Sequence, residues 1–140
     1  MNTRKKIGSV IILILAITIA YIGYKKYTAG PVDIKSAKAF TVAASKLLQD
    51  YSNAETEANK RYLGKILVVT GEVKEVAKNQ EGQSIVILKT DDPINSVNCT
   101  MEEKPVQFQP GSTVSLKGLC TGYLMDVYVT RCYVIKNKNL

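Results

Sequence analysis

The sequence predicts a small all-β domain, a closed barrel of five short strands, which follows an apolar membrane helix and a short helical segment. Three observations support this fold class. Residues 62–76 alternate apolar and polar side chains, four shorter stretches with strand character follow at regular intervals, and a run of uncharged residues lies near the N-terminus. Short strands separated by regular turns are typical of an all-β barrel or sandwich.

The apolar run covers Ile7–Tyr24, which holds 18 residues without a charge, mainly Ile, Leu, Val and Ala. As a helix it would be about 27 Å long, close to the roughly 30 Å hydrocarbon core of a bilayer. Basic residues precede it at positions 4–6, and Tyr21, Tyr24 and Tyr27 lie at interface depth. We therefore expect residues 1–27 to form a single-pass anchor with the N-terminus inside. The alternative is a cleaved signal peptide, with an imperfect cleavage site at Thr18–Ala20.

A short linker and a helical segment come next. Gly30 and Pro31 mark a linker over residues 28–34, and residues 35–63 read as helical. The first helical pattern begins at Ser36, and the pair Ser52 and Glu55 matches a capping box that would begin a second helix. Apolar side chains at three- and four-residue spacing predict that this segment packs on the barrel; they are Ala37, Phe40, Ala44, Leu47, Leu48 and Tyr51.

The first predicted strand, residues 62–76, carries the strongest β pattern. Leu67, Val69, Gly71 and Val73 fall on one face, and polar residues occupy much of the other. Glycine inside a strand usually marks a bend or a bulge. A bent first strand can pair with one sheet along its first half and with another along its second half, which would close a small barrel.

Four further strands are predicted at residues 84–89, 97–101, 114–120 and 127–135. The intervening segments, residues 77–83, 90–95, 102–110 and 121–126, are rich in Gly, Pro, Asn and Asp and read as turns or connections. Together with the first strand, these elements place the barrel within residues 64–140.

The charge and composition of the chain limit the kinds of ligand that it can bind. The formal net charge is +7, but from Pro31 onward 14 basic and 12 acidic residues leave only +2. A nearly neutral domain has little general attraction for phosphate. The chain has no histidine, and its three cysteines, 21 and 12 residues apart, match no paired metal motif. We expect no metal and no cofactor.

Two pairs of neighbouring acids are candidate catalytic groups. Asp91 with Asp92 and Glu102 with Glu103 lie in turn or connector sequence, and no activated nucleophile accompanies them. Solvated turn carboxylates are the simpler interpretation, so we expect a protein that is not an enzyme.

Short motifs between residues 35 and 136 occur in an order shared with a known family. They are Asn53–Ala58, Tyr62–Lys65, Val69–Val73, Val97–Cys99, Gly111, Val114, Gly118–Gly122, Asp126–Val127 and Cys132. In order and spacing they resemble the tRNA_anti-like family of small bacterial exported or membrane-tethered OB-fold proteins. The resemblance implies a five-stranded Greek-key barrel with helices at its N-terminal side, and it brings no catalytic motif.

The implied fold also indicates where a ligand would bind. OB-fold barrels bind ligands on the face of the second and third strands and in the loops after the first and fourth. Tyr123 lies in the second of these loops, and Lys117, Tyr128 and Arg131 are the neighbouring outward residues, so these four are the predicted ligand-binding residues. The alternative is that Tyr123 covers a barrel end and Tyr128 packs against the helical segment.

We therefore expect a membrane-anchored binding or adaptor module on the outer, periplasmic side of the cytoplasmic membrane. Its ligand would be an oligonucleotide or an oligosaccharide. The family label suggests nucleic acid by fold analogy, but single-strand binding needs several aromatic residues over a basic groove, and here two tyrosines lie in a nearly neutral domain. The alternative is a structural envelope protein whose barrel contacts another protein or peptidoglycan.

The OB-fold that the resemblance implies also predicts which cysteines could pair. In this barrel the third strand lies beside the fifth, so Cys99 and Cys132 are the predicted disulfide partners if the domain is exported. Cys120 would lie opposite a residue near Val127, about 16 Å along the strand from Cys132, which is too far for a bridge. The alternative is three buried free cysteines that act as small apolar side chains.

Overall fold

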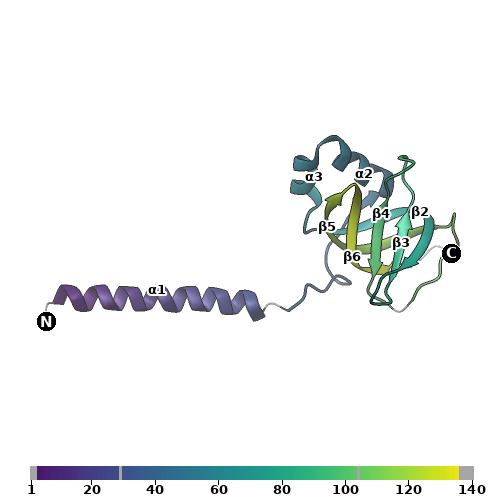
Figure 1. The fold of residues 1–140 in the computed structure, drawn as a ribbon. Helices are drawn as coiled ribbons and strands as arrows, with labels where there is room; N and C mark the ends of the chain where they lie inside the picture. The colour runs from purple at the N-terminus through teal and green to yellow at the C-terminus, as the bar shows by residue number, and fades with distance from the viewer. Residues whose placement is uncertain (1–2, 29, 104, 136–140) are drawn as a thin grey trace. The chain divides into compact units, whose positions relative to one another are not determined.

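The computed structural model describes residues 3–28, 30–103 and 105–135, and the chain divides into two units, residues 1–32 and 33–140 (Figure 1). The first unit is one helix, α1 (Thr3–Thr28). Its stretch Lys6–Tyr27 has 22 residues and a mean hydropathy of 2.3, so it is long and apolar enough to cross a bilayer. The side chains of Arg4 and Lys5, expected before the apolar run, lie outside the described residues.

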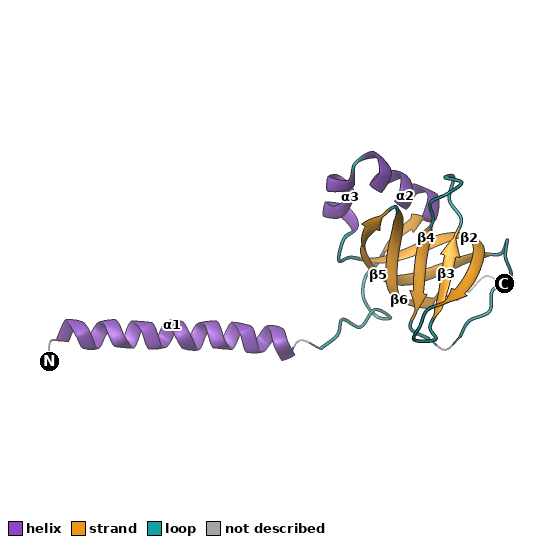
Figure 2. Cartoon of the chain, in the orientation of Figure 1, coloured by secondary structure: helices purple, strands orange, loops and turns teal. Residues whose placement is uncertain are grey.

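The second unit contains the predicted five-stranded barrel (Figure 2). Its strands are β2 (Ile66–Lys78), β3 (Ser84–Leu88), β4 (Val97–Met101), β5 (Thr113–Leu124) and β6 (Asp126–Val134). They pair in the order β2-β3-β4-β6-β5, and β5 returns to β2 to close the barrel. The third and fifth barrel strands, β4 and β6, run parallel, and the other barrel pairs are antiparallel. This closed Greek-key order confirms the OB-fold.

β2 changes partner along its length, as its sequence predicts. Its first part, Ile66–Glu72, pairs with β5, and its second part, Val73–Lys78, pairs with β3. The register shift lies between Val73 and Glu75, beyond the glycine. Gly71 has a different role, because a Cβ there would lie 2.9 Å from the Cβ of Ala44. The glycine therefore permits close approach of the N-terminal helical segment.

The helical segment begins later than its apolar spacing predicts. Phe40–Ala43 forms a short strand, β1, which pairs in parallel with β2 from Phe40↔Leu67 to Ala43↔Thr70. The predicted helix from Ser36 is therefore wrong for residues 36–43. The backbone of β1 gains hydrogen bonds from the edge of β2, and tertiary pairing of this kind overrides a weak local helix pattern.

Two short helices, α2 (Ala44–Asn53) and α3 (Glu55–Tyr62), contact the barrel strands. The predicted capping box is absent: Ser52 lies inside α2, and the N-cap of α3 is Ala54, which makes no side-chain cap hydrogen bond. The apolar sides of both helices join one core with the inward residues of the barrel. Their buried members are Ala44, Leu47, Leu48, Tyr51, Ala58 and Tyr62.

The β5–β6 connection is also shorter than predicted. The segment expected as a loop, residues 121–126, is mostly strand, because β5 runs to Leu124 and β6 begins at Asp126. Only Met125 separates them, with a φ of 71°. Residues 136–140, at the end of the predicted barrel, lie outside the described part of the chain.

Candidate binding surface

β3, β4 and β6 lie side by side in the barrel wall (Figure 2). Their partly exposed outward side chains form a set that we call the strand face. Along each of these strands the inward residues are buried and the alternate residues are not. The strand face consists of Ile85, Ile87, Asn98, Thr100 and Tyr128. It lies over the second and third barrel strands, which is where ligands bind in this fold.

Strand register places three of these side chains in one row. Ile87 pairs with Asn98 across β3 and β4, and Asn98 pairs with Tyr128 across β4 and β6. Neighbouring strands are about 4.8 Å apart, so the row spans about 10 Å. Tyr128 is 40% exposed, and its next partner in register is Gly122 on β5.

Within the described part of the chain, the Asn98 side chain is hydrogen-bonded through its amide nitrogen and not through its amide oxygen. Its Nδ2 donates to Oδ2 of Asp126 at 3.2 Å, while Oδ1 of Asp126 accepts from the backbone N–H of Ser96 at 2.7 Å. The amide oxygen of Asn98 is a buried acceptor without a hydrogen-bond partner among the described residues. Buried acceptors of this kind are commonly satisfied by ordered water.

Tyr123, the first of the predicted ligand-binding residues, packs on the helical segment. Its ring stacks on the buried Tyr51 of α2 with ring centroids 5.3 Å apart and an interplanar angle of 20°. The Tyr51 hydroxyl lies 3.5 Å from Sγ of Cys120, and burial raises the pKa of both groups. These contacts favour the alternative role for Tyr123, a cover for the barrel end.

Lys117 and Arg131 also lie in structured surroundings. Nζ of Lys117 donates to the carbonyl oxygens of Lys35 at 2.9 Å and Ala37 at 2.6 Å, so this lysine fixes the chain before β1 on the barrel wall. Arg131 has a φ of 54° and lies where the β6 register shifts against both β4 and β5. Register brings Tyr128 alone of the four predicted residues into the row with Ile87 and Asn98.

A groove at the end of the barrel was not predicted. Three adjoining hollows of about 490, 330 and 370 Å³ share the β3–β4 loop residues Thr90 and Asp91. Oδ1 of Asp91 accepts from Oγ of Ser45 at 3.2 Å. The Asp92 carboxylate accepts from the backbone N–H groups of Ile94 and Asn95, both at 2.8 Å, and these bonds lower its pKa. Asp91 therefore links the loop to α2, and Asp92 stabilises the turn within the loop.

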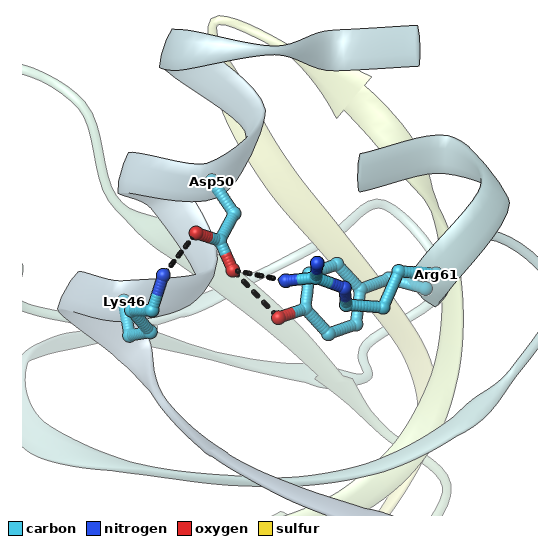
Figure 3. A network of polar contacts seen from close by, with 4 residues as sticks. Lys46, Asp50 and Arg61 are labelled. Atoms are coloured by element: carbon cyan, nitrogen blue, oxygen red, sulfur yellow. Dashed lines mark hydrogen bonds and ion pairs between the residues drawn. The ribbon is translucent and has the colours of Figure 1, made fainter. Parts of the chain in front are cut away.

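Asp50 forms a charged cluster between the two short helices (Figure 3). Its carboxylate accepts from Nζ of Lys46 and from the Tyr62 hydroxyl at 2.7 Å, and lies 3.4 Å from Nη1 of Arg61. Burial alone raises the pKa of Asp50, but the hydrogen bonds from Lys46 and Tyr62 outweigh it, and the pKa lies below its ordinary 3.8. The cluster joins α2 to α3.

The described residues contain no group of three or more His, Cys, Asp or Glu side chains that could hold a metal ion. What the geometry provides is an uncharged row of side chains on a rigid β surface. Residues 1–134 match the model of the family tRNA_anti-like. The chain belongs to the tRNA_anti-like family.

The fold of this tRNA_anti-like protein recurs in a solved structure from Klebsiella pneumoniae subsp. pneumoniae MGH 78578, named as a candidate nucleic acid-binding lipoprotein. The TM-score is 0.56 at 18% sequence identity, and the match covers 76% of this chain and 99% of the other. At this identity the likeness shows a shared fold.

Two other solved structures match with TM-scores below 0.5. The yeast Stn1 and Ten1 structure has a TM-score of 0.46 at 16% identity, covering 73% of this chain and 65% of that chain. A candidate aspartyl-tRNA synthetase from Leishmania major Friedlin has a TM-score of 0.44 at 12% identity, covering 86% and 26%. No curated protein matches this tRNA_anti-like chain.

Proposed function

We propose that this tRNA_anti-like protein is a membrane-anchored, non-enzymatic binding module on the outer side of the cytoplasmic membrane. α1 would be its anchor, and the strand face would bind the ligand. The observation that carries the proposal is the row of Ile87, Asn98 and Tyr128. It combines an apolar side chain, an amide side chain and a partly exposed ring on the face where OB-folds bind polymers.

An oligosaccharide fits this row better than an oligonucleotide. The strand face has no charged side chain, and residues from Pro31 onward carry a formal charge of only +2. Amide, hydroxyl and aromatic groups can bind a neutral sugar chain without phosphate contacts. An oligonucleotide is the second ligand class. Its support is the name of the Klebsiella structure and the position of Arg131 on β6.

The proposal is tested on residues 31–140, which contain the barrel and its complete core. An N-acetylglucosamine oligomer and an oligothymidine would be titrated at low salt, with calorimetry and tyrosine fluorescence as readouts. We expect the sugar to bind and Tyr128→Ala to weaken binding about 5-fold or more, because truncation of an aromatic residue at the centre of a binding surface typically costs about 1 kcal/mol or more.

Two control variants separate the ring from the fold. Tyr128→Phe keeps the stacking surface and should bind like the original chain, and Lys60→Ala changes an exposed residue of α3 and should have no effect. If oligothymidine binds and the sugar does not, the ligand class is nucleic acid and not oligosaccharide. Equal affinity of Tyr128→Ala for the bound polymer would remove the strand face from the proposal.

A structural role in the envelope is the second candidate function, and one observation favours it. Leu124 and Met125, at the tip between β5 and β6, are 78% and 65% exposed, and Ile94 in the β3–β4 loop is 75% exposed. Apolar residues at loop tips are suited to protein contact. A stoichiometric partner that copurifies with the original chain and is lost from Leu124→Ser would favour this role, provided that Tyr128→Ala retains the partner.

A further inference from the structure

Two inward-facing cysteines lie on neighbouring barrel strands. Cys99 belongs to β4 and Cys132 to β6, and both side chains are 0% exposed. In the parallel register, Cys99 pairs with Val129 and Met101 pairs with Cys132. Three steps along β6 therefore match two steps along β4, and this bulge lies between the two cysteine positions. The proposed binding function uses neither thiol.

The barrel wall opposite Cys132 is shaped to accept its sulfur. A Cβ on Gly118 of β5 would lie 2.5 Å from Sγ of Cys132, so the thiol occupies the space that a side chain at position 118 would fill. All three cysteines are free and buried, and the Cys132 thiol donates to the carbonyl oxygen of Val129 at 3.5 Å. The neighbouring Cys99 thiol, together with burial, raises the pKa of Cys132. Cys120 contacts the Tyr51 hydroxyl instead.

We propose that Cys99 and Cys132 form a disulfide that joins β4 to β6 when the chain folds outside the cytoplasm, and that Cys120 stays a thiol. Formation removes two protons and two electrons from the two thiols. A disulfide-bearing oxidoreductase accepts them by thiol–disulfide exchange and leaves as a dithiol. The location outside the cytoplasm rests on the proposed function, whereas the choice of partners rests on the barrel register.

Burial determines when this bond forms. A thiolate must reach the oxidant's disulfide, and the folded barrel exposes neither Cys99 nor Cys132. Oxidation therefore takes place while β4 and β6 come together, and the finished bond is shielded from reductants. The same burial retains Cys120 as a thiol in the folded chain.

Refolding of the full-length chain in detergent tests the pairing. The reduced, unfolded chain would be refolded in a glutathione redox buffer, denatured, alkylated, reduced and alkylated again with a reagent of different mass. We expect one first-stage label, on Cys120, and two second-stage labels, on Cys99 and Cys132. Reduction should lower the midpoint of thermal unfolding by about 10 °C or more.

Single variants identify the partners. Cys120→Ala should lose the first-stage label and keep the bond, whereas Cys99→Ala and Cys132→Ala should each show two first-stage labels. Three first-stage labels on the refolded original chain, or a bond that includes Cys120, would overturn the proposal.

The same labelling in intact cells separates this proposal from the proposed location. Two second-stage labels in cells agree with both the disulfide pairing and the location outside the cytoplasm. If refolding gives the bond but cells hold three free thiols, then the pairing stands and the location outside the cytoplasm fails.

Discussion

Asp50 receives its contacts from residues of both short helices, and the contacts with Lys46 and Arg61 are ion pairs. Lys46 lies one turn earlier on α2, while Arg61 and Tyr62 belong to α3. The side chain is 14% exposed, so solvent screens these contacts less than it screens a surface ion pair. Asp50 therefore couples the packing of α3 to that of α2.

Asp50→Asn should lower the free energy of unfolding of residues 31–140 by about 1–2 kcal/mol at pH 7, because asparagine keeps an acceptor but lacks the negative charge that strengthens the contacts with Lys46 and Arg61. The folded-state pKa of Asp50 lies below 3.8, so its contribution is present above pH 3.8 and is lost as the pH falls through the folded value. Urea denaturation at pH 7 and pH 3 measures this difference. Glu57→Gln, in an exposed pair with Lys60, is the control and should have no measurable effect. A pH-independent loss for Asp50→Asn would show that its charge is not involved.

Tyr128 and Tyr123 show where sequence analysis of the site succeeds and where it stops. Alternation along the fifth predicted strand indicates that Tyr128 faces outward, and the structure agrees. The sequence predicts a loop over residues 121–126, whereas Tyr123 lies on β5 and stacks on Tyr51. Contacts between residues so far apart leave no mark in local spacing. The partners of Lys117, two backbone carbonyls near the linker, are hidden for the same reason.

Two strand glycines provide space rather than unusual backbone angles. Gly71 lies where α2 begins against β2, and Gly118 lies where β5 faces β6. A methyl group at position 71 would approach the side chains of Ala44 and Leu88, whereas one at 118 would approach the carbonyl oxygen of Thr130 at 2.8 Å. Backbone cannot move aside as readily as a side chain.

Gly71→Ala should therefore cost about 1–3 kcal/mol of unfolding free energy, and Gly118→Ala should cost more. Thermal or urea unfolding of residues 31–140 gives both values, and circular dichroism shows whether the barrel persists. The exposed substitution Lys60→Ala in α3 should leave the midpoint unchanged. If Gly71→Ala were the more damaging change, the packing of β5 against β6 would be looser than described.

The sequence predicts the barrel strands well because each has an inward face of alternate apolar residues. The sequence does not predict β1, because the spacing of Ala37, Phe40 and Ala44 matches the period of a helix. What determines the conformation there is the open edge of β2, and parallel pairing with a later strand has no local signature. The absent Ser52 cap has a similar cause, because α2 continues through that residue.

The whole chain combines a compact barrel unit with a helix of quite different chemistry. α1 has no acidic residue in its first turn, and Lys25 and Lys26 lie in its last turn, so charge flanks the apolar stretch and does not interrupt it. Length and hydropathy suit a bilayer, and anchoring is part of the proposed function.

Removal of residues 1–30 should move the protein from the membrane fraction to the soluble fraction without a change in the unfolding midpoint of the barrel. Fractionation of cells that express the full and the shortened chains measures the first effect, and thermal unfolding measures the second. Recovery of the full chain as a soluble product that begins after Ala20 would instead identify a cleaved signal peptide.

The closure of the barrel by β2 and β5 has a consequence for synthesis. Ile66 pairs with Leu119, so the first half of β2 leaves the ribosome well before its antiparallel neighbour exists. During that interval its hydrogen-bonding groups on that side are open to any other extended chain. Slow translation between β4 and β5 lengthens this interval and should increase aggregation of the nascent protein.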